Sequence, residues 1–81
     1  MTKVEHKPEF LKLISKLDNF LKERVKKQVA KIINNPEIGK PMRFARKGTR
    51  ELYIKPFRLV YAYEKNEDKI IILDLYHKDE Q

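Results

Sequence analysis

The chain has no cysteine, and only two of its 81 residues are glycine. Without cysteine it can form no disulfide, thiolate metal site or cysteine nucleophile, which fits a reducing cytosol. It has no run of about 18 apolar residues, so we expect no transmembrane helix. The N-terminal stretch MTKVEHKPEF lacks the apolar segment of a signal peptide. These absences predict a small cytoplasmic protein that does not associate with membranes.

What the chain does contain is a sizeable apolar fraction and an excess of positive charge. Hydrophobic residues make up 41% of it, which favours one folded domain over residues 1–81. The net charge is +7, and the stretch from Lys40 to Arg58 holds seven Lys or Arg against one acidic residue, Glu51. A positive net charge of this size fits two interpretations equally well. One is a polyanionic partner such as nucleic acid, and the other is a solvated basic surface.

Hydrophobic spacing predicts two helices followed by strands. Residues 2–6 are a short candidate strand, and the apolar residues of segment 8–34 recur at helical spacing, with Asp18 or Asn19 as a cap in between. Residues 36–49 read as a loop. The stretches RELYI, PFRLVYAYE and KIIILDLYH then predict three strands. The order β-α-α-β-β-β predicts an α+β fold, with a helical hairpin packed on one face of a mainly antiparallel four-stranded sheet.

The register of the last hairpin depends on where its turn lies. A turn centred on residues 66–67 pairs Tyr61 with Ile72 and Leu59 with Asp74. Alternate residues of a strand point to opposite sides, so one side, which includes Tyr76, is nearly all apolar or aromatic and should carry the helices. Asp74 falls on that apolar side. Either it faces the sheet margin and pairs with a lysine, or the register slips by one residue there.

The other side of the predicted sheet carries four candidate catalytic residues. A tight turn at Lys55-Pro56 brings Glu51, Tyr53 and Arg58 to this side, and the hairpin register places His77 near Arg58. Arginine can bind a phosphate in a bidentate manner, and histidine exchanges a proton near neutral pH. Glu51 and Tyr53 could act as base, acid or hydrogen-bond donor. Such a set could let the 2′-hydroxyl of RNA attack the adjacent phosphate without a metal or other cofactor.

Simpler interpretations of these residues stay open. An arginine within a strand commonly pairs with a carboxylate, which Glu51 or Asp74 could supply. A lone histidine near the end of a basic chain is commonly a surface residue. We expect the cations around the site to contact RNA phosphates; they are Lys40, Arg43, Arg46, Lys47, Arg50, Lys55 and Lys78.

The C-terminal half, RELYIKPFRLVYAYEKNEDKIIILDLYHKDEQ, resembles the RelE/ParE superfamily of toxins from toxin–antitoxin systems. FRLVYAY is similar to the YRLVY core strand of RelE and YoeB toxins, and LYHK is similar to the C-terminal strand of YoeB-like toxins. The stretch NPEIGKP occupies the expected turn. The resemblance matches Arg58 to the phosphate-binding arginine and His77 to the C-terminal histidine. Met42 stands where YoeB-like toxins carry a glutamate, so Glu51 is a proton acceptor by geometry alone.

The resemblance implies a function and partners. RelE and YoeB toxins cleave messenger RNA in the ribosomal A site, and an antitoxin such as RelB wraps and blocks them. We therefore expect a metal-independent endoribonuclease that acts on ribosome-bound message and inhibits translation. Two alternatives stay open: a ParE-like toxin that inhibits DNA gyrase by binding, and an inactive member of the fold that binds only RNA or its antitoxin.

Overall fold

The computed structural model describes residues 2–43 and 48–77. The expected order of helices and strands is present, with one short strand added inside the segment read as a loop. The elements are β1 (Lys3–His6), α1 (Pro8–Ser15), α2 (Asn19–Asn34), β2 (Lys40–Pro41), β3 (Thr49–Ile54), β4 (Phe57–Glu64), a 3-10 turn (Lys65–Glu67) and β5 (Lys69–His77). No helix in the described ranges has the length and apolar character needed to cross a membrane.

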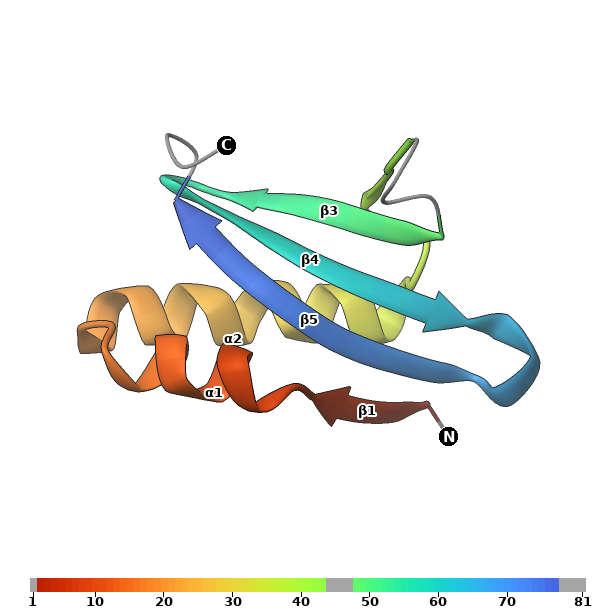
Figure 1. The fold of residues 1–81 in the computed structure, drawn as a ribbon, viewed down its shortest axis with the longest axis horizontal. Helices are drawn as coiled ribbons and strands as arrows, with labels where there is room; N and C mark the ends of the chain where they lie inside the picture. Colours follow the sequence, from red (N-terminus) through yellow and green to blue (C-terminus); the bar gives the residue numbers. More distant parts are fainter. Residues whose placement is uncertain (1, 44–47, 78–81) are drawn as a thin grey trace.

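The strands form one mixed sheet in the order β1-β5-β4-β3-β2. β1 is parallel to β5, and every other pair is antiparallel. The fold class is therefore the predicted α+β class, but the sheet has five strands rather than four. The strand that the sequence did not predict, β2, is only two residues long, and its proline and flanking glycine are residues that loops favour. Figure 1 shows the twisted sheet with β1 at the edge next to β5.

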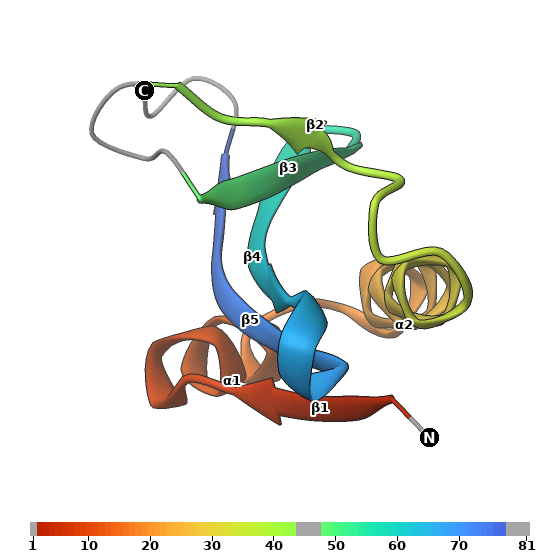
Figure 2. The same cartoon turned by 90° about the vertical axis from the view of Figure 1, so that its right-hand side faces the viewer.

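The two helices begin and end where local chemistry predicts. Pro8 occupies the first turn of α1, where its missing N–H is not needed. Asp18 caps α2, because its side chain accepts a hydrogen bond of 2.8 Å from the Leu21 N–H. α2 ends at Asn34, just ahead of Pro36. In Figure 1 this helix runs across one side of the sheet, and Figure 2 shows it nearly end-on beside the curved strands.

Both helices pack on the same face of the sheet, called the helix face below. Its core combines Phe10 of α1 and Val25 and Ile32 of α2 with strand residues. The buried strand residues of this cluster are Ile54, Leu59, Tyr61, Ile70, Ile72 and Leu75. The opposite side of the sheet, called the open face, carries Glu51, Tyr53 and Arg58 at alternating positions.

The β4–β5 register follows the prediction only near its turn. Tyr61 pairs with Ile72 as expected, but Val60 then pairs with Asp74, so Leu73 is an extra residue in a β-bulge. The predicted pairing of Leu59 with Asp74 is therefore wrong. The bulge places Leu75 opposite Leu59 in the core, where Leu75 is 3% exposed. Burying a leucine there is favourable, whereas burying the Asp74 carboxylate would carry a large desolvation cost.

Candidate functional site

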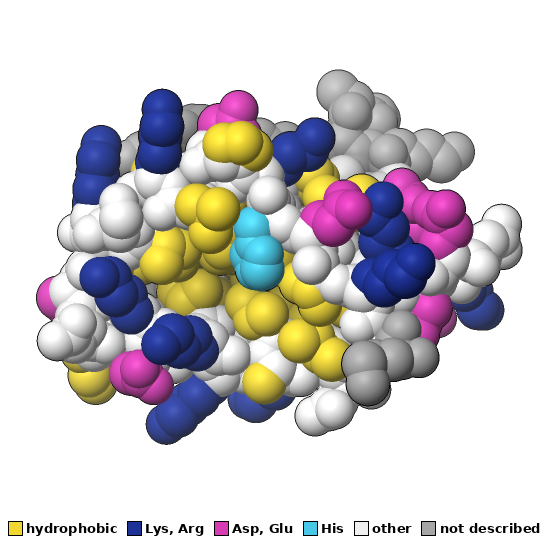
Figure 3. All heavy atoms as spheres, turned by 90° about the horizontal axis from the view of Figure 1, so that it is seen from below, with side chains coloured by type: hydrophobic (Ala, Val, Ile, Leu, Met, Phe, Trp, Pro, Cys, Tyr) yellow, Lys and Arg dark blue, Asp and Glu magenta, His cyan; other side chains and the backbone are white. Residues whose placement is uncertain are grey.

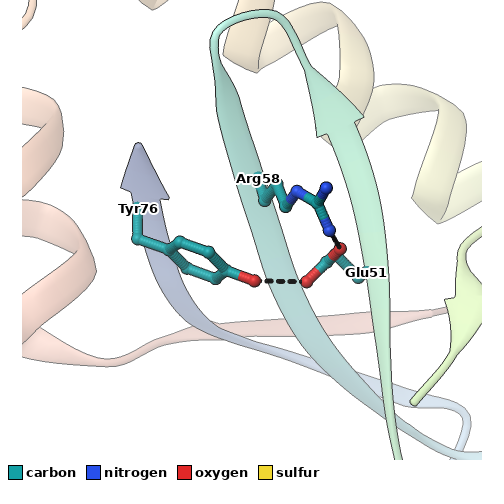
Figure 4. Close-up of polar contacts among 3 residues, drawn as sticks. All are labelled: Glu51, Arg58 and Tyr76. Carbon is teal, nitrogen blue, oxygen red and sulfur yellow. Dashed lines mark hydrogen bonds and ion pairs between the residues drawn. The ribbon is translucent and has the colours of Figure 1, made fainter. Parts of the chain in front are cut away.

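A polar cluster on the open face joins three neighbouring strands. Glu51 of β3 lies between Arg58 of β4 and Tyr76 of β5, as Figure 4 shows. Arg58 Nη1 donates to Glu51 Oε1 at 2.7 Å, and the Tyr76 hydroxyl donates to Glu51 Oε2 at 2.5 Å. The carboxylate thus accepts one hydrogen bond on each oxygen and retains further lone pairs for a substrate hydroxyl.

Glu51 and Arg58 form an ion pair that is sheltered on one side and open on the other. The side chain of Glu51 is 9% exposed and that of Arg58 is 32% exposed. The hydrogen bond from Arg58 to Glu51 raises the pKa of the guanidinium above its usual value, and the nearby negative charge of Glu51 acts in the same direction. Burial opposes this shift. Arg58 therefore stays a cation at every pH at which the protein would work.

The cluster faces an open cleft of about 440 Å³, called the cationic cleft below. The residues that line it are Lys40, Pro41, Met42, Arg43, Glu51 and Arg58. Lys40 pairs directly with Glu51 across β2 and β3, so both side chains point to the same side of the sheet. Three cations and one carboxylate in a concave space favour an anionic ligand with several charges, such as a nucleic-acid backbone.

Tyr53 lies beside Arg58, as the register predicted. The two residues pair across β3 and β4, and the Arg58 guanidinium carbon is 6.0 Å from the centre of the Tyr53 ring. The Tyr53 side chain is among the exposed large apolar groups, at 51% exposure. An exposed aromatic ring beside a cation is a suitable surface for stacking a nucleic-acid base.

His77 does not lie beside Arg58, and this expectation from the sequence is wrong. The bulge at Leu73 shifts the end of β5 by one residue, so that Arg58 pairs with Tyr76 and Phe57 pairs with His77. The rings of Phe57 and His77 meet edge to face, with centroids 5.6 Å apart. Phe57 packs against the core cluster, so His77 lies on the helix face at the end of the sheet.

Tyr76 is the site residue that sequence reasoning missed, because an unbroken register assigned it to the core. One signal could have found it. Asp74 stood on the apolar side in that register, and a one-residue slip, which the sequence analysis left open, moves Asp74 and Tyr76 together onto the open face.

The predicted RNA-contacting cations that belong to the described residues lie at three different places. Lys40 and Arg43 line the cleft. Arg50 precedes Glu51 in β3 and donates to backbone carbonyls of the loop before β2. Lys55 is in the β3–β4 turn, where its carbonyl accepts from Arg24 at 2.6 Å. Arg46, Lys47 and Lys78 lie outside the described residues.

Within residues 2–43 and 48–77, no three His, Asp or Glu side chains come together as a candidate metal site. The side chains at the cleft could bind a phosphate through Arg58 and accept a proton on Glu51, and the neighbouring Tyr76 could donate one.

A second surface lies on the opposite side of the molecule, between α1 and α2. It is an apolar groove of about 300 Å³. Its lining residues are His6, Phe10, Leu11, Ile14, Lys22, Val25, Lys26, Val29, Ala30 and Ile33. Figure 3 shows an apolar patch on this side with lysine or arginine side chains around it. Leu11 is 54% exposed and Ile33 38%, so the groove presents apolar surface that a partner could bury.

Comparisons with known proteins agree on the family and on the fold. The family model for the ParE toxin of type II toxin–antitoxin systems matches residues 4–81. No curated protein sequence matches the chain. The structure is similar to the RelBE2 toxin–antitoxin complex of Mycobacterium tuberculosis, with a TM-score of 0.85, 22% identity, and coverage of 95% of this chain and 98% of that chain.

Two further solved structures have the same fold at lower identity. The archaeal RelE–RelB complex from Pyrococcus horikoshii has a TM-score of 0.81 and 15% identity, with 99% of this chain and 98% of that chain covered. A YoeB/ParE toxin from Agrobacterium tumefaciens has a TM-score of 0.83 and 12% identity, with 94% and 98% covered. At these identities the likeness concerns the fold.

Proposed function

This chain belongs to the ParE toxin family of type II toxin–antitoxin systems, within the RelE/ParE superfamily, and we propose that it cleaves messenger RNA on the ribosome. The observation that carries the proposal is the cluster of Glu51, Arg58 and Tyr76 at the cationic cleft. A cation, a proton acceptor and a proton donor on one open face are the groups that RNA cleavage by its own 2′-hydroxyl needs.

In the proposed reaction, the cleft binds the scissile phosphate and Glu51 takes the proton of the 2′-hydroxyl. The 2′-oxygen then bonds to phosphorus, and the bond from phosphorus to the 5′-oxygen breaks. Arg58 stabilises the extra negative charge on the phosphate as it develops. Tyr76 gives its proton to the leaving 5′-oxygen, and the products are a 2′,3′-cyclic phosphate and a 5′-hydroxyl.

The hydrogen bond between Tyr76 and Glu51 gives the proposed cycle a way to close. After cleavage Glu51 holds the proton from the 2′-hydroxyl, and Tyr76 has lost one. Because the two oxygens are 2.5 Å apart, the proton can pass directly from Glu51 to Tyr76 and restore the starting state. We therefore assign the proton donor to Tyr76 in place of His77, which lies on the other face.

A single-turnover assay on programmed ribosomes tests this function. Wild-type protein should cut the message in the A site, also in EDTA as long as the ribosomes stay intact, and should leave a 2′,3′-cyclic phosphate. Glu51→Gln keeps the shape of the side chain but removes the proton acceptor, and should slow cleavage by roughly 10²–10⁴-fold. Glu23→Gln, an exposed carboxylate of α2, is the matched control and should cleave normally. Equal rates for both variants would contradict the assignment of Glu51.

We further propose that an acidic, amphipathic segment of an antitoxin binds the groove between α1 and α2. Several of the similar structures are complexes of a toxin with its antitoxin. Lys22 and Lys26 line this groove together with apolar side chains, so a helix with one apolar and one acidic face would match it in both respects. A second copy of this basic chain would instead bring like charges together.

The binding test uses the product of the reading frame next to the gene, purified with this protein. Leu11→Glu should weaken binding at least tenfold, because it places a charge in the apolar groove. Phe20→Glu is the matched control, since Phe20 is 72% exposed and does not line the groove. Equal losses for both variants, or none, would mean that the antitoxin binds elsewhere.

The second candidate is inhibition of DNA gyrase by binding. Two observations favour it: the matching family model is that of ParE, and His77 lies away from Arg58. A supercoiling assay with purified gyrase decides between the two candidates. Inhibition by wild type and by Glu51→Gln alike, with no cleavage of ribosome-bound message, would support binding without RNA chemistry.

A further inference from the structure

The loop before β2 is fixed to the sheet by a buried tyrosine. Tyr61 lies in the middle of β4 and is 0% exposed. Its hydroxyl accepts a hydrogen bond of 2.9 Å from the Gly39 N–H and donates one of 2.8 Å to the Pro36 carbonyl. One side chain thus satisfies two backbone groups in the segment that connects α2 to the sheet, and the only hydrogen that the hydroxyl can donate is used within the fold.

Arg50 holds the same loop from the neighbouring strand. It pairs with Tyr61 across β3 and β4. Its Nη1 donates to the carbonyl of Glu37 at 3.0 Å and to that of Gly39 at 2.8 Å. Between them, Tyr61 and Arg50 bind both the N–H and the carbonyl of Gly39. The charge pattern predicts that Arg50 contacts RNA, but its guanidinium donates to the loop backbone.

Gly39 permits this close contact. A Cβ atom at residue 39 would lie 2.7 Å from the Tyr61 hydroxyl oxygen and 2.8 Å from Cε1 of the ring. It would also lie 3.1 Å from the Arg50 Cβ. The backbone of the loop therefore rests directly on the two side chains, and any larger residue would push it away from the sheet.

The loop leads straight into one wall of the cationic cleft. Lys40 follows Gly39 and pairs with Glu51, and Arg43 lies shortly after. Both side chains line the cleft together with Arg58. β2 has only two residues, so its own ladder to β3 provides few hydrogen bonds to hold this wall. Hydrogen bonds from Tyr61 and Arg50 add the anchoring that so short a strand lacks.

We propose that Tyr61 is a positioning residue for the phosphate site. Its hydroxyl fixes residues 36–39, and this holds Lys40 and Arg43 in the same cleft as Arg58. Arg50 and Gly39 take part in the same set of contacts, which is called the loop bracket below. The inference rests on the proposed function, because it takes the cleft to be a site for RNA phosphates. Its ligand class is the sugar-phosphate backbone, bound through charge and position rather than base sequence.

Amide hydrogen exchange tests the contacts of the loop bracket without any RNA. In Tyr61→Phe the Gly39 amide loses its acceptor, so its exchange should become at least tenfold faster, while amides of α2 and β5 keep their protection. Tyr63→Phe is the matched control: Tyr63 lies on the same strand and face, but its hydroxyl donates to Asp68 at 3.4 Å. It should leave the Gly39 amide unchanged.

A binding cycle with a short fluorescent single-stranded RNA tests the positioning role. Lys40→Ala with Arg43→Ala should weaken binding about tenfold and lower its salt dependence, as fewer phosphates are neutralised. Tyr61→Phe should weaken binding several-fold, also with a lower salt dependence, although it removes no charge. In the combined variant the loss should equal that of Lys40→Ala with Arg43→Ala alone, because the residues that Tyr61 positions are already absent.

Three outcomes separate the inference from its premise. Unchanged exchange at Gly39 in Tyr61→Phe, or a loss of RNA affinity that adds in full to that of the double variant, overturns the positioning role. Unchanged RNA binding in the double variant overturns the phosphate site, and the inference is overturned with it. If Tyr61→Phe loses protection throughout, Gly39→Ala replaces it in both measurements, with the same results expected.

Discussion

Two adjacent residues of β5 lie on opposite faces of the sheet and have different contacts. On the open face, Tyr76 donates to Glu51, which lines the cationic cleft together with Arg58. On the helix face, the next residue, His77, contacts the ring of Phe57 at the margin of the core. The single extra residue Leu73 decides which of these two side chains lies on the open face, beside Arg58. In a strand, position along the chain therefore says little about function until the register is known.

After Glu51→Gln, the largest expected effect is that of Arg58→Ala on the open face. Arg58→Ala removes the cation that would stabilise the phosphate, so the rate of cleavage on programmed ribosomes should fall on the order of 10²–10³-fold. The thermal midpoint should change little, because the Arg58 side chain is partly exposed. Lys27→Ala, on the exposed side of α2, is the control and should cleave normally. If Arg58→Ala unfolds while Arg58→Met stays folded and fully active, the role of the arginine is structural and not catalytic.

Two leucines of β5 test the bulge that separates the faces. Leu75→Ala empties a core position that is 3% exposed and should lower the free energy of unfolding by about 2–4 kcal/mol. Leu73→Ala, at the half-buried bulge residue, should cost about 1 kcal/mol or less. Urea denaturation measures both. Without a bulge the two leucines would share the open face, and both changes would then cost little.

The adjacent pair Tyr76 and His77 gives the next test. Tyr76→Phe removes only the hydroxyl that we assign as proton donor, and should slow cleavage by roughly 10²-fold. His77→Gln should change the rate by less than about threefold, because the side chain lies on the other face. Both rates come from the single-turnover assay at saturating protein. If His77→Gln cleaves slowly and Tyr76→Phe cleaves at the normal rate, the proton donor is His77 and not Tyr76.

The smallest effect concerns the tyrosine of the helix face and depends on pH. Burial raises the pKa of Tyr61 above its usual 10.0, although the hydrogen bond from Gly39 lowers it in part. A raised pKa in the folded state favours the neutral phenol, so its stabilisation is complete below about pH 10 and is lost as pH rises through the folded pKa.

Tyr61→Phe should therefore differ from wild type by about 1–2 kcal/mol in unfolding free energy at pH 7, since it leaves two backbone groups without their partner. The difference should shrink above about pH 10, where wild type loses the contribution of Tyr61 and the variant does not. Urea midpoints of both proteins across this range measure it. A difference that stays constant with pH would mean that the pKa of Tyr61 is the same in the folded and in the unfolded state.

Much of the fold could be predicted from the sequence, because local rules determine it. The helical spacing of apolar residues, Pro8 at the start of α1 and Asp18 at the cap of α2 each depend on neighbours within a turn. The β3–β4 pairing, including Tyr53 with Arg58, followed from one tight turn. Arg58 and Glu51 were placed together for that reason, and FRLVYAY indicated the family that the matching model confirms.

The sequence by itself thus determined the α+β class, the start of both helices and the end of α2, the toxin family, and two of the three residues of the polar cluster. Tertiary structure alone decided the bulge, the two-residue β2 and the exchange of His77 for Tyr76. The bulge arises because the core gains more from burying Leu75 than from burying Asp74, and that balance exists only when the helices cover the sheet. Tyr61 and Arg50 hydrogen-bond to the loop before β2 from strands more than ten residues away. Interactions of this range are not determined by local spacing, so only the folded chain shows which residues face the cleft.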